Sequence, residues 1–165
     1  MFAATDVQYL DEGGARAALV LAPDEAFSTV TVEERVLVPD VAPYEPGEFY
    51  RRELPCLRAV LARSLSNVKL LVIDGYVDLD PSGRPGLGAH AYQEFGVPVI
   101  GVAKTRFDTA THAAEVRRGQ DAVRPLYVTA AGLPVADAAA LVEGMSGKHR
   151  LPDALRRVDQ LARGR

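Results

Sequence analysis

Hydrophobic residues form two nearly unbroken runs in the middle of the chain, at residues 70–73 and 97–102. Runs of this length are typical of strands that are buried on both faces of a sheet. Residues 86–95, between the two runs, have the pattern of a short helix. A strand, a helix and a strand in this order predict a right-handed parallel crossover. Such a crossover brings Asp74 and Lys104, which follow the two runs, to the edge of the sheet where open α/β sheets bind ligands.

Alternating and β-branched residues near the N-terminus predict three further strands. They lie at residues 2–10, at residues 15–22 and within residues 28–39, and because short turns join them we expect an antiparallel meander. Asp6 falls in the middle of the first strand, where aspartate is uncommon and is costly to bury without a partner. It is therefore either a solvent-facing residue of a half-exposed sheet or a ligand for a metal ion.

A loop with two prolines and a glycine precedes a predicted helix at about residues 47–65. Because proline restricts the backbone, the loop around Tyr44 is expected to be rigid and exposed. The expected core face of the helix consists of leucines at helical spacing: Leu54, Leu57, Leu61 and Leu65. Glu53 stands next to this face, and taken alone it is an ordinary surface residue.

The composition is typical of a globular protein, with 48% hydrophobic and 25% charged residues, and we expect one domain over residues 1–165. The net charge of −3 excludes a broad basic surface, so any nucleic-acid site must be a local patch or depend on metal ions. Cys56 is the single cysteine, which excludes a disulfide and a multi-cysteine zinc site, and the histidines are too scattered to bind zinc. Neither a signal peptide nor a membrane span is recognisable, so we expect a cytoplasmic protein with no membrane partner.

Asp6, Glu53 and Asp74 together resemble the metal-binding carboxylates of ribonuclease H-like proteins, with one on a strand, one on a helix and one at a strand end. The segments around them resemble the endonuclease V family in order and spacing. The matching segments are ATDVQY, PYEPGEFYRRELPCL, VIDG, GLGAH and GVAKTR, and YVTAAGLPVADAAALV and RLPDALRRVDQLA match more weakly. The resemblance implies an α/β, ribonuclease H-like fold, in which a three-stranded antiparallel meander is extended by parallel strands and helices cover both faces.

The resemblance also implies a divalent-metal-dependent endonuclease. Asp6, Glu53 and Asp74 would hold the metal, and their hard carboxylate oxygens suit Mg²⁺, with Mn²⁺ as an alternative. Two such ions can generate a nucleophile and stabilise the leaving oxygen. Lys104 resembles the family's active-site lysine, whose ammonium lies near the scissile phosphate, and the alternative is a structural lysine at a strand end.

The same resemblance implies how the substrate is bound. A rigid aromatic wedge that inserts at a lesion is matched by Pro43, Tyr44, Glu45 and Pro46. The base pocket is matched by Gly47, Gly75, Gly86 and Leu87. Glycines permit close approach of the backbone to a flipped base. The implied partner is single-stranded or distorted DNA or RNA that contains inosine, cleaved 3′ to that base or to another deaminated base.

Some positions depart from the family pattern. Glu45 replaces an aliphatic residue of the wedge, and its carboxylate would weaken binding near phosphates. Tyr76 and Asp80 stand where the family has two histidines. The region after Lys104 is also shorter than in the family, and the family's N-terminal helix is missing.

A further departure lies after the last predicted strand. Leu133 follows Gly132 where the family has Gly-His, and that histidine lies near the metal site. Its absence predicts weak binding of a second metal and slow cleavage, which Leu133→His should accelerate. Asp137, on the following helix, is a candidate substitute ligand.

Two classes of function remain open at this point. The retained residues Asp6, Glu53, Asp74 and Lys104 favour a nuclease. The departures favour the alternative, a weak or inactive endonuclease V-like domain that binds nucleic acid, a nucleotide or a protein partner. A different phosphoryl-transfer enzyme on the same fold has no motif of its own in the chain. The choice between DNA and RNA and the oligomeric state are not determined by the sequence.

Overall fold

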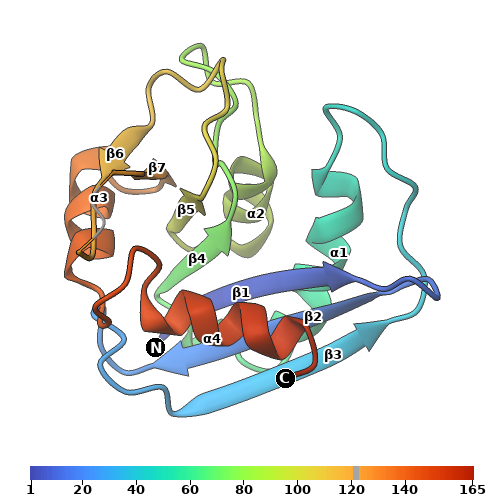
Figure 1. Cartoon of the computed structure of the whole chain (residues 1–165). Helices are drawn as coiled ribbons and strands as arrows, with labels where there is room; N and C mark the ends of the chain where they lie inside the picture. The colour runs from blue at the N-terminus through green and yellow to red at the C-terminus, as the bar shows by residue number, and fades with distance from the viewer. Residues whose placement is uncertain (121–122) are drawn as a thin grey trace.

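The computed structural model describes residues 1–120 and 123–165, which form one mixed sheet covered by helices (Figure 1). The strands, in chain order, are β1 (Phe2–Tyr9), β2 (Ala15–Ala22), β3 (Val32–Val38), β4 (Leu70–Asp74), β5 (Val99–Ala103), β6 (Ala114–Val116) and β7 (Leu126–Ala131). The helices are α1 (Tyr50–Leu61), a short 3-10 helix η1 (Leu65–Asn67), α2 (Leu87–Phe95), α3 (Val135–Gly144) and α4 (Asp153–Ala162).

The strands form a seven-stranded sheet in the order β3-β2-β1-β4-β5-β7-β6. β1, β2 and β3 make the predicted antiparallel meander, and β4 and β5 extend it as parallel strands. The last predicted strand, β7, runs antiparallel to β5, and β6 pairs with β7 at the far edge. β6 was not predicted, because three residues are too few to show a hydrophobic period.

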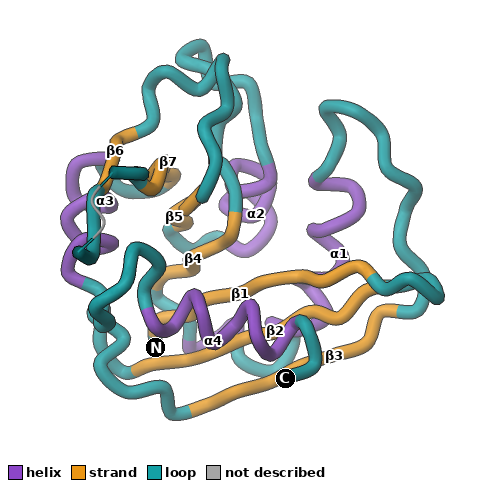
Figure 2. The backbone as a smooth tube through the Cα atoms, viewed as in Figure 1, coloured by secondary structure: helices purple, strands orange, loops and turns teal. Residues whose placement is uncertain are grey.

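Helices cover both faces of the sheet, as predicted (Figure 2). Apolar residues of α1 and α2 pack on one face, in the core that contains Leu57, Leu61 and Leu87. Apolar residues of α3 and α4 pack on the other face, in the core that contains Val142 and Val158. The alternation of side chains along each strand sends successive residues to these two cores. None of the helices in the described ranges is long and apolar enough to span a membrane.

The loop and the helix after the meander differ in length from the prediction. α1 begins at Tyr50 rather than near residue 47 and ends at Leu61, and Leu65 lies in η1. The expected core face is formed by Leu57 and Leu61, which are fully buried, while Leu54 is partly buried. The shorter helix leaves a longer loop between β3 and α1, and Glu53, in the first turn of α1, interacts electrostatically with Asp6 and with Asp74 at the end of β4.

Candidate active site

Asp6 and Asp74 lie side by side at one edge of the sheet. In the parallel pairing of β1 with β4, Thr5 faces Ile73, so the two aspartates occupy the next positions on adjacent strands. Neighbouring strands lie about 4.8 Å apart. Because side chains alternate along a strand, both aspartates are on the face covered by α4.

Glu53 approaches the same edge from the opposite face, on the first turn of α1. Its side chain is buried, and Tyr9 donates a hydrogen bond from its hydroxyl to Glu53 Oε2 over 3.4 Å. Burial raises the pKa of Glu53, and the negative charges of Asp6 and Asp74 raise it further. The three predicted carboxylates therefore share one electrostatic environment, although they come from two sides of the sheet.

Asp6 is half-buried, and its pKa is also raised. Burial raises its pKa to about 6, with the charge of Asp74 as the second cause. The backbone N–H of Val7, which donates to Asp6 Oδ1 over 2.8 Å, opposes the shift. A carboxylate that is difficult to ionise alone gains most from a nearby cation.

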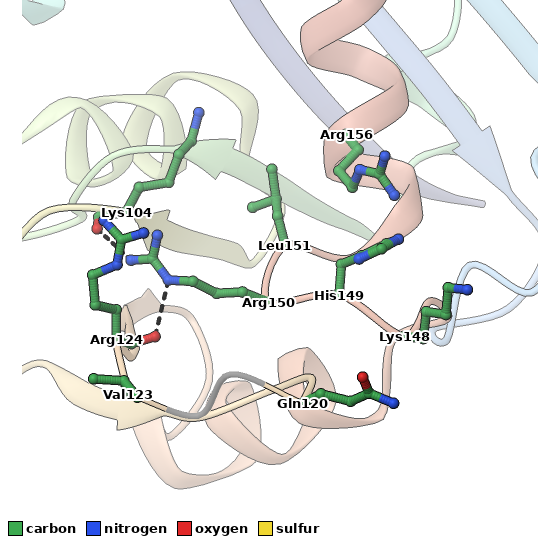
Figure 3. A pocket seen from close by; sticks show the side chains of 9 residues that line it. All are labelled: Lys104, Gln120, Val123, Arg124, Lys148, His149, Arg150, Leu151 and Arg156. Carbon is green, nitrogen blue, oxygen red and sulfur yellow. Dashed lines mark hydrogen bonds between the residues drawn. The ribbon is translucent and has the colours of Figure 1, made fainter.

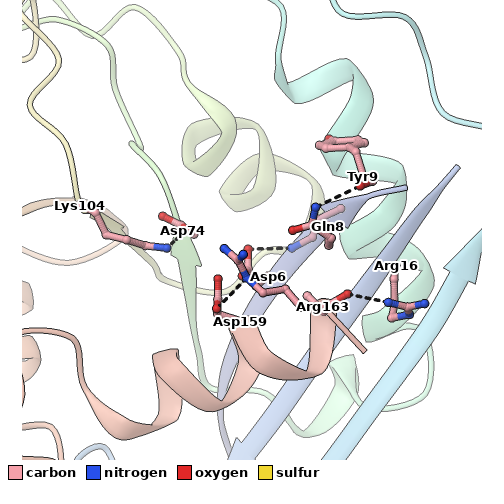
Figure 4. Close-up of polar contacts among 10 residues, drawn as sticks. Asp6, Gln8, Tyr9, Arg16, Asp74, Lys104, Asp159 and Arg163 are labelled. Atoms are coloured by element: carbon pink, nitrogen blue, oxygen red, sulfur yellow. Dashed lines mark hydrogen bonds and ion pairs between the residues drawn. The ribbon is translucent and has the colours of Figure 1, made fainter. Parts of the chain in front are cut away.

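Lys104 supplies one such cation. Its Nζ lies 2.9 Å from Asp74 Oδ2, and the side chains of the two residues remain 39% and 36% exposed (Figure 4). Burial alone would lower the pKa of Lys104, but the charge and hydrogen bond of Asp74 and the charge of Asp6 outweigh it, and the pKa is raised. Lys104 therefore remains protonated at the edge where the carboxylates gather.

Asp159 is a fourth carboxylate at this site, and the sequence did not predict it. It lies on α4, where Arg163 donates to its Oδ2 over 3.0 Å, and its charge raises the pKa values of Asp6 and Lys104 (Figure 4). The sequence contains one signal that Asp159 lies near the sheet, because Asp159 follows Val158, a core residue of α4. That signal became informative only once α4 was seen to pack across β1.

The chemistry of these side chains fits a hard divalent cation. The site offers carboxylate oxygens that raise one another's pKa values, and the buried Thr5 Oγ1, beside Asp6 and Asp74 in a narrow crevice, has no hydrogen-bond partner within the described residues. As the side chains stand, however, no group of three or more histidine, cysteine, aspartate or glutamate residues in the described ranges is arranged to hold a metal ion. Lys104 instead neutralises Asp74.

All four predicted base-pocket residues line a single cavity of about 270 Å³: Gly47, Gly75, Gly86 and Leu87. Aromatic rings supply much of its remaining wall: Tyr44, Phe49, Tyr50, Tyr76 and Phe107. Asp74 also lines this cavity, so the cavity opens directly beside the carboxylates. A concave, largely apolar chamber with a few polar groups is typical of a small-molecule or base-binding site.

The glycines of this cavity are required by its geometry. A Cβ on Gly86 would lie 2.8 Å from the carbonyl oxygen of Tyr76 and 2.9 Å from that of Val77, so no side chain fits there. Gly75 has φ +128, a conformation that other residues rarely adopt. The backbone can therefore form the wall of the cavity directly at these two positions.

The predicted wedge residues Pro43, Tyr44, Glu45 and Pro46 are all exposed. The side chain of Tyr44 is 62% exposed and also lines the cavity of about 270 Å³, which we refer to as the base cavity. The guanidinium of Arg52 lies 4.0 Å from the centre of the Tyr9 ring and 6.0 Å from that of Tyr44. One cation therefore lies next to the aromatic ring of the predicted wedge.

Tyr76 has a structural role at the position where the family has a histidine. Its hydroxyl donates to the backbone carbonyl of Thr105 over 2.7 Å and accepts from the backbone N–H of Phe107 over 3.0 Å. These two hydrogen bonds connect the segment after β5 to Tyr76, which lines the base cavity. Asp80 stabilises a turn, since its Oδ1 accepts from the backbone N–H and hydroxyl of Ser82.

The hypothesis about Leu133 is wrong. β7 runs antiparallel to β5, with Ala131 opposite Val99, so Leu133 lies near the beginning of β5, at the edge opposite Lys104. Its side chain packs against the core beneath α3. Asp137, in the first turn of α3, follows at the same end and is not a substitute ligand. The error arose because the direction of β7 cannot be seen in its hydrophobic pattern.

Comparison with known proteins shows which family the chain resembles. Residues 1–127 match the family model described as Endonuclease V. Endonuclease V of Azotobacter vinelandii is 32% identical over 181 residues, which cover 98% of this chain and 81% of the relative.

Two solved structures extend the comparison. That of endonuclease V from Streptomyces avermitilis superposes with a TM-score of 0.83 at 29% identity, covering 99% of this chain and 79% of that one. The endonuclease V of Ciona intestinalis, solved with a 23mer DNA containing an inosine, has the same fold, with a TM-score of 0.83 at 18% identity over 99% of this chain and 83% of that one. These likenesses confirm the predicted ribonuclease H-like fold.

Proposed function

This chain belongs to the endonuclease V family, a family of nucleases, and from this premise we propose that it is a divalent-metal-dependent endonuclease that cleaves 3′ to inosine or another deaminated base. The substrate would be single-stranded or distorted DNA or RNA, and the metal Mg²⁺ or Mn²⁺. We place this activity in a single domain of residues 1–165, and in the cytoplasm. The observation that carries the proposal is the position of Asp74, which belongs both to the carboxylate site and to the wall of the base cavity.

The base cavity supports recognition of a flipped base. Its volume of about 270 Å³ and its aromatic walls suit one planar base, and the backbone at Gly75 and Gly86 can approach the base edge. Tyr44 stands at the same cavity, where its ring would fill the space that the flipped base leaves in the stack. The relative from Ciona intestinalis was solved with inosine-containing DNA, which supports the same substrate class here.

The carboxylates support hydrolysis. Asp6, Glu53 and Asp74 would hold the metal, with Asp159 beside them. When bound, the divalent ion supplies a nucleophile at neutral pH and positive charge for the scissile phosphate and the leaving oxygen. Asp74 lines the base cavity, and Asp6 lies beside it in the narrow crevice that Lys104 also lines, so the ammonium of Lys104 would lie near a phosphate bound at the carboxylates.

The test is cleavage of single-stranded oligonucleotides, in DNA and in RNA, that contain one inosine. We expect products with 3′-hydroxyl and 5′-phosphate ends in Mg²⁺ or Mn²⁺, and none with a chelator. Asp74→Asn should lower the rate at least about 100-fold because it removes a metal ligand. Asp40→Asn, an exposed loop residue, is the matched control and should cleave at the rate of the unmodified protein. Cleavage by Asp74→Asn at that rate would refute the metal role.

A second function has one specific observation in its favour. As the side chains stand, Lys104 pairs with Asp74 and no described group of three ligands is arranged for a metal. That arrangement suits an endonuclease V-like domain that binds nucleic acid, a nucleotide or a protein partner without cutting. Inosine-dependent binding without cleavage over a full range of Mg²⁺ and Mn²⁺ concentrations would decide for this alternative.

A further inference from the structure

A second and larger cavity, of about 830 Å³, has Lys104 among the residues that line it (Figure 3). Its basic lining comes from the end of β5, from the segment before β7, from the loop between α3 and α4, and from α4 itself. These residues are Lys104, Arg124, Lys148, His149, Arg150 and Arg156. No aspartate or glutamate is among the described residues that line it. We refer to it as the basic cavity.

The cations of this cavity differ in how far they are already neutralised. Arg150 is held by backbone carbonyls, donating to Arg124 O over 2.9 Å and to Pro125 O over 2.8 Å, so it builds the cavity wall. Arg156 lies 3.6 Å from the carboxylate of Asp153. The positive charges of Arg150 and Arg156 are therefore already partly compensated by protein groups.

Arg124 and Lys148 are different. Both are exposed, and neither side chain makes a hydrogen bond or an ion pair within residues 1–120 and 123–165. In a chain with a net charge of −3, unpaired cations gathered around one cavity form a local site for anions rather than part of a general basic surface.

The basic cavity and the base cavity meet at one ion pair. Asp74 lines the base cavity, Lys104 lines the basic cavity, and their charged atoms lie 2.9 Å apart. The narrow crevice that contains Asp6 lies between the two cavities and shares both residues. A strand whose base occupied the first cavity would pass over the carboxylates to reach the second.

The basic cavity suits a sugar–phosphate backbone. Its described lining contains cations and no tyrosine, phenylalanine or tryptophan on which a base could stack. Contacts of this kind position the nucleic acid without reading its sequence. The two cavities thus divide the recognition of one strand, with a base in the first and phosphates in the second.

We propose that the basic cavity binds the phosphates that follow the scissile bond on its 3′ side, with Arg124 and Lys148 as the principal contacts. The direction rests on the proposed function, because a strand cleaved 3′ to the bound base runs from the base cavity, across the carboxylates, toward its 3′ end. The same chemistry serves DNA and RNA, since both present one phosphate per nucleotide.

The test compares two variants with the same change in charge. Arg124→Gln/Lys148→Gln removes the two cations of the basic cavity whose side chains have no partner among the described residues. Arg63→Gln/Lys69→Gln removes two exposed cations, one past the C-terminal end of α1 and one before β4, at the edge opposite the active site. Binding to a fluorescent single strand with one inosine is measured by anisotropy at several salt concentrations, with Ca²⁺ in place of Mg²⁺ so that binding is read apart from cleavage.

We expect the basic-cavity variant to bind on the order of tenfold more weakly at 0.1 M salt and to lose about 1.4 from the slope of log affinity against log salt, because each phosphate contact to a single strand contributes about 0.7. The control pair should keep the slope of the unmodified protein. Equal slopes for the two variants would overturn the proposal.

Shortened strands test the direction. With only one or two nucleotides on the 3′ side of the cut, the variant and the unmodified protein should bind alike, whereas shortening the 5′ side should leave the tenfold difference in place. A difference that survives 3′ shortening, or that follows the 5′ side, would overturn the proposal. If the unmodified protein binds with the expected slope but never cleaves, the proposed function fails and the phosphate site stands.

Discussion

The ammonium of Lys104 and the carboxylate of Asp74 lie 2.9 Å apart, at the ends of two adjacent parallel strands. The strand pairing places Asp74 opposite Val102, two residues before the lysine, so the sheet itself holds the pair together. A divalent ion that binds Asp74 must compete with this ammonium. At the proposed metal site Lys104 would therefore compete with the metal for Asp74, and its ammonium would also lie near the scissile phosphate.

Lys104→Gln should lower both the Mg²⁺ concentration needed for cleavage and the maximal rate of cleavage. Without the ammonium, Asp74 is free for the metal, so half-maximal cleavage should need less Mg²⁺. The maximal rate should fall by about tenfold to a hundredfold, because one positive group is lost from the developing negative charge. A metal titration of single-turnover cleavage measures both effects. An unchanged maximal rate would mean that the lysine only supports the fold.

The metal-free protein should be less stable at pH 8 than at pH 5. The pKa of Asp6 is raised from 3.8 to about 6, mainly by burial and then by Asp74, so the folded state holds this proton more tightly than the unfolded chain does. The resulting stability is fully present below pH 4 and is lost as the pH rises through 6. The full shift of about two units corresponds to about 3 kcal/mol below pH 4, of which roughly half, about 1.4 kcal/mol, is lost between pH 5 and pH 8, and Glu53 acts in the same direction.

Urea unfolding with a chelator present, at pH 5 and pH 8, measures this difference. Asp6→Asn should reduce it, because the substituted side chain no longer titrates. Added Mg²⁺ should restore stability at pH 8, where the carboxylates are ionised and bind the ion. If the free energy of unfolding depends on pH identically in Asp6→Asn and in the unmodified protein, the raised pKa of Asp6 is contradicted.

Gly86→Ala should damage the base cavity and the fold together. Its Cβ would lie 2.8 Å from a backbone oxygen of Tyr76, which cannot move without distorting the cavity wall. We expect a loss of about 1–3 kcal/mol in the free energy of unfolding and weaker discrimination between inosine and guanine strands. Gly144→Ala is the control, because no described atom outside its chain neighbours and its own helix backbone lies within 4 Å of its added Cβ, and it should be neutral or slightly stabilising.

Substitutions at Asp159 and Leu133 should differ in a metal titration: the first should shift the Mg²⁺ dependence of cleavage, and the second should not. Asp159→Asn removes a charge that acts on both Asp6 and Lys104, so it should lower the pKa of Asp6 and shift the Mg²⁺ dependence of cleavage. Leu133→His should leave both the metal dependence and the maximal rate unchanged, since it lies at the opposite edge of the sheet. Faster cleavage by Leu133→His would contradict the observed direction of β7.

The sequence by itself determined the framework of the site. Apolar runs that end in Asp74 and at Lys104 predicted two buried parallel strands, and strand ends on parallel neighbours meet at one edge for geometric reasons. The glycines of the base cavity and the prolines of the wedge were predicted from the resemblance to the family, and glycine suits the local backbone that the structure shows at Gly75 and Gly86.

Only the tertiary structure decided how distant segments meet. The antiparallel direction of β7 moved Leu133 away from the site, and the packing of α4 across the sheet brought Asp159 into it. The basic cavity likewise combines four separate segments, one of them carrying Arg124 and another Lys148. A hydrophobic period records which face of an element is buried but not which partner covers it or in which direction that partner runs, and those two facts decide which charges become neighbours.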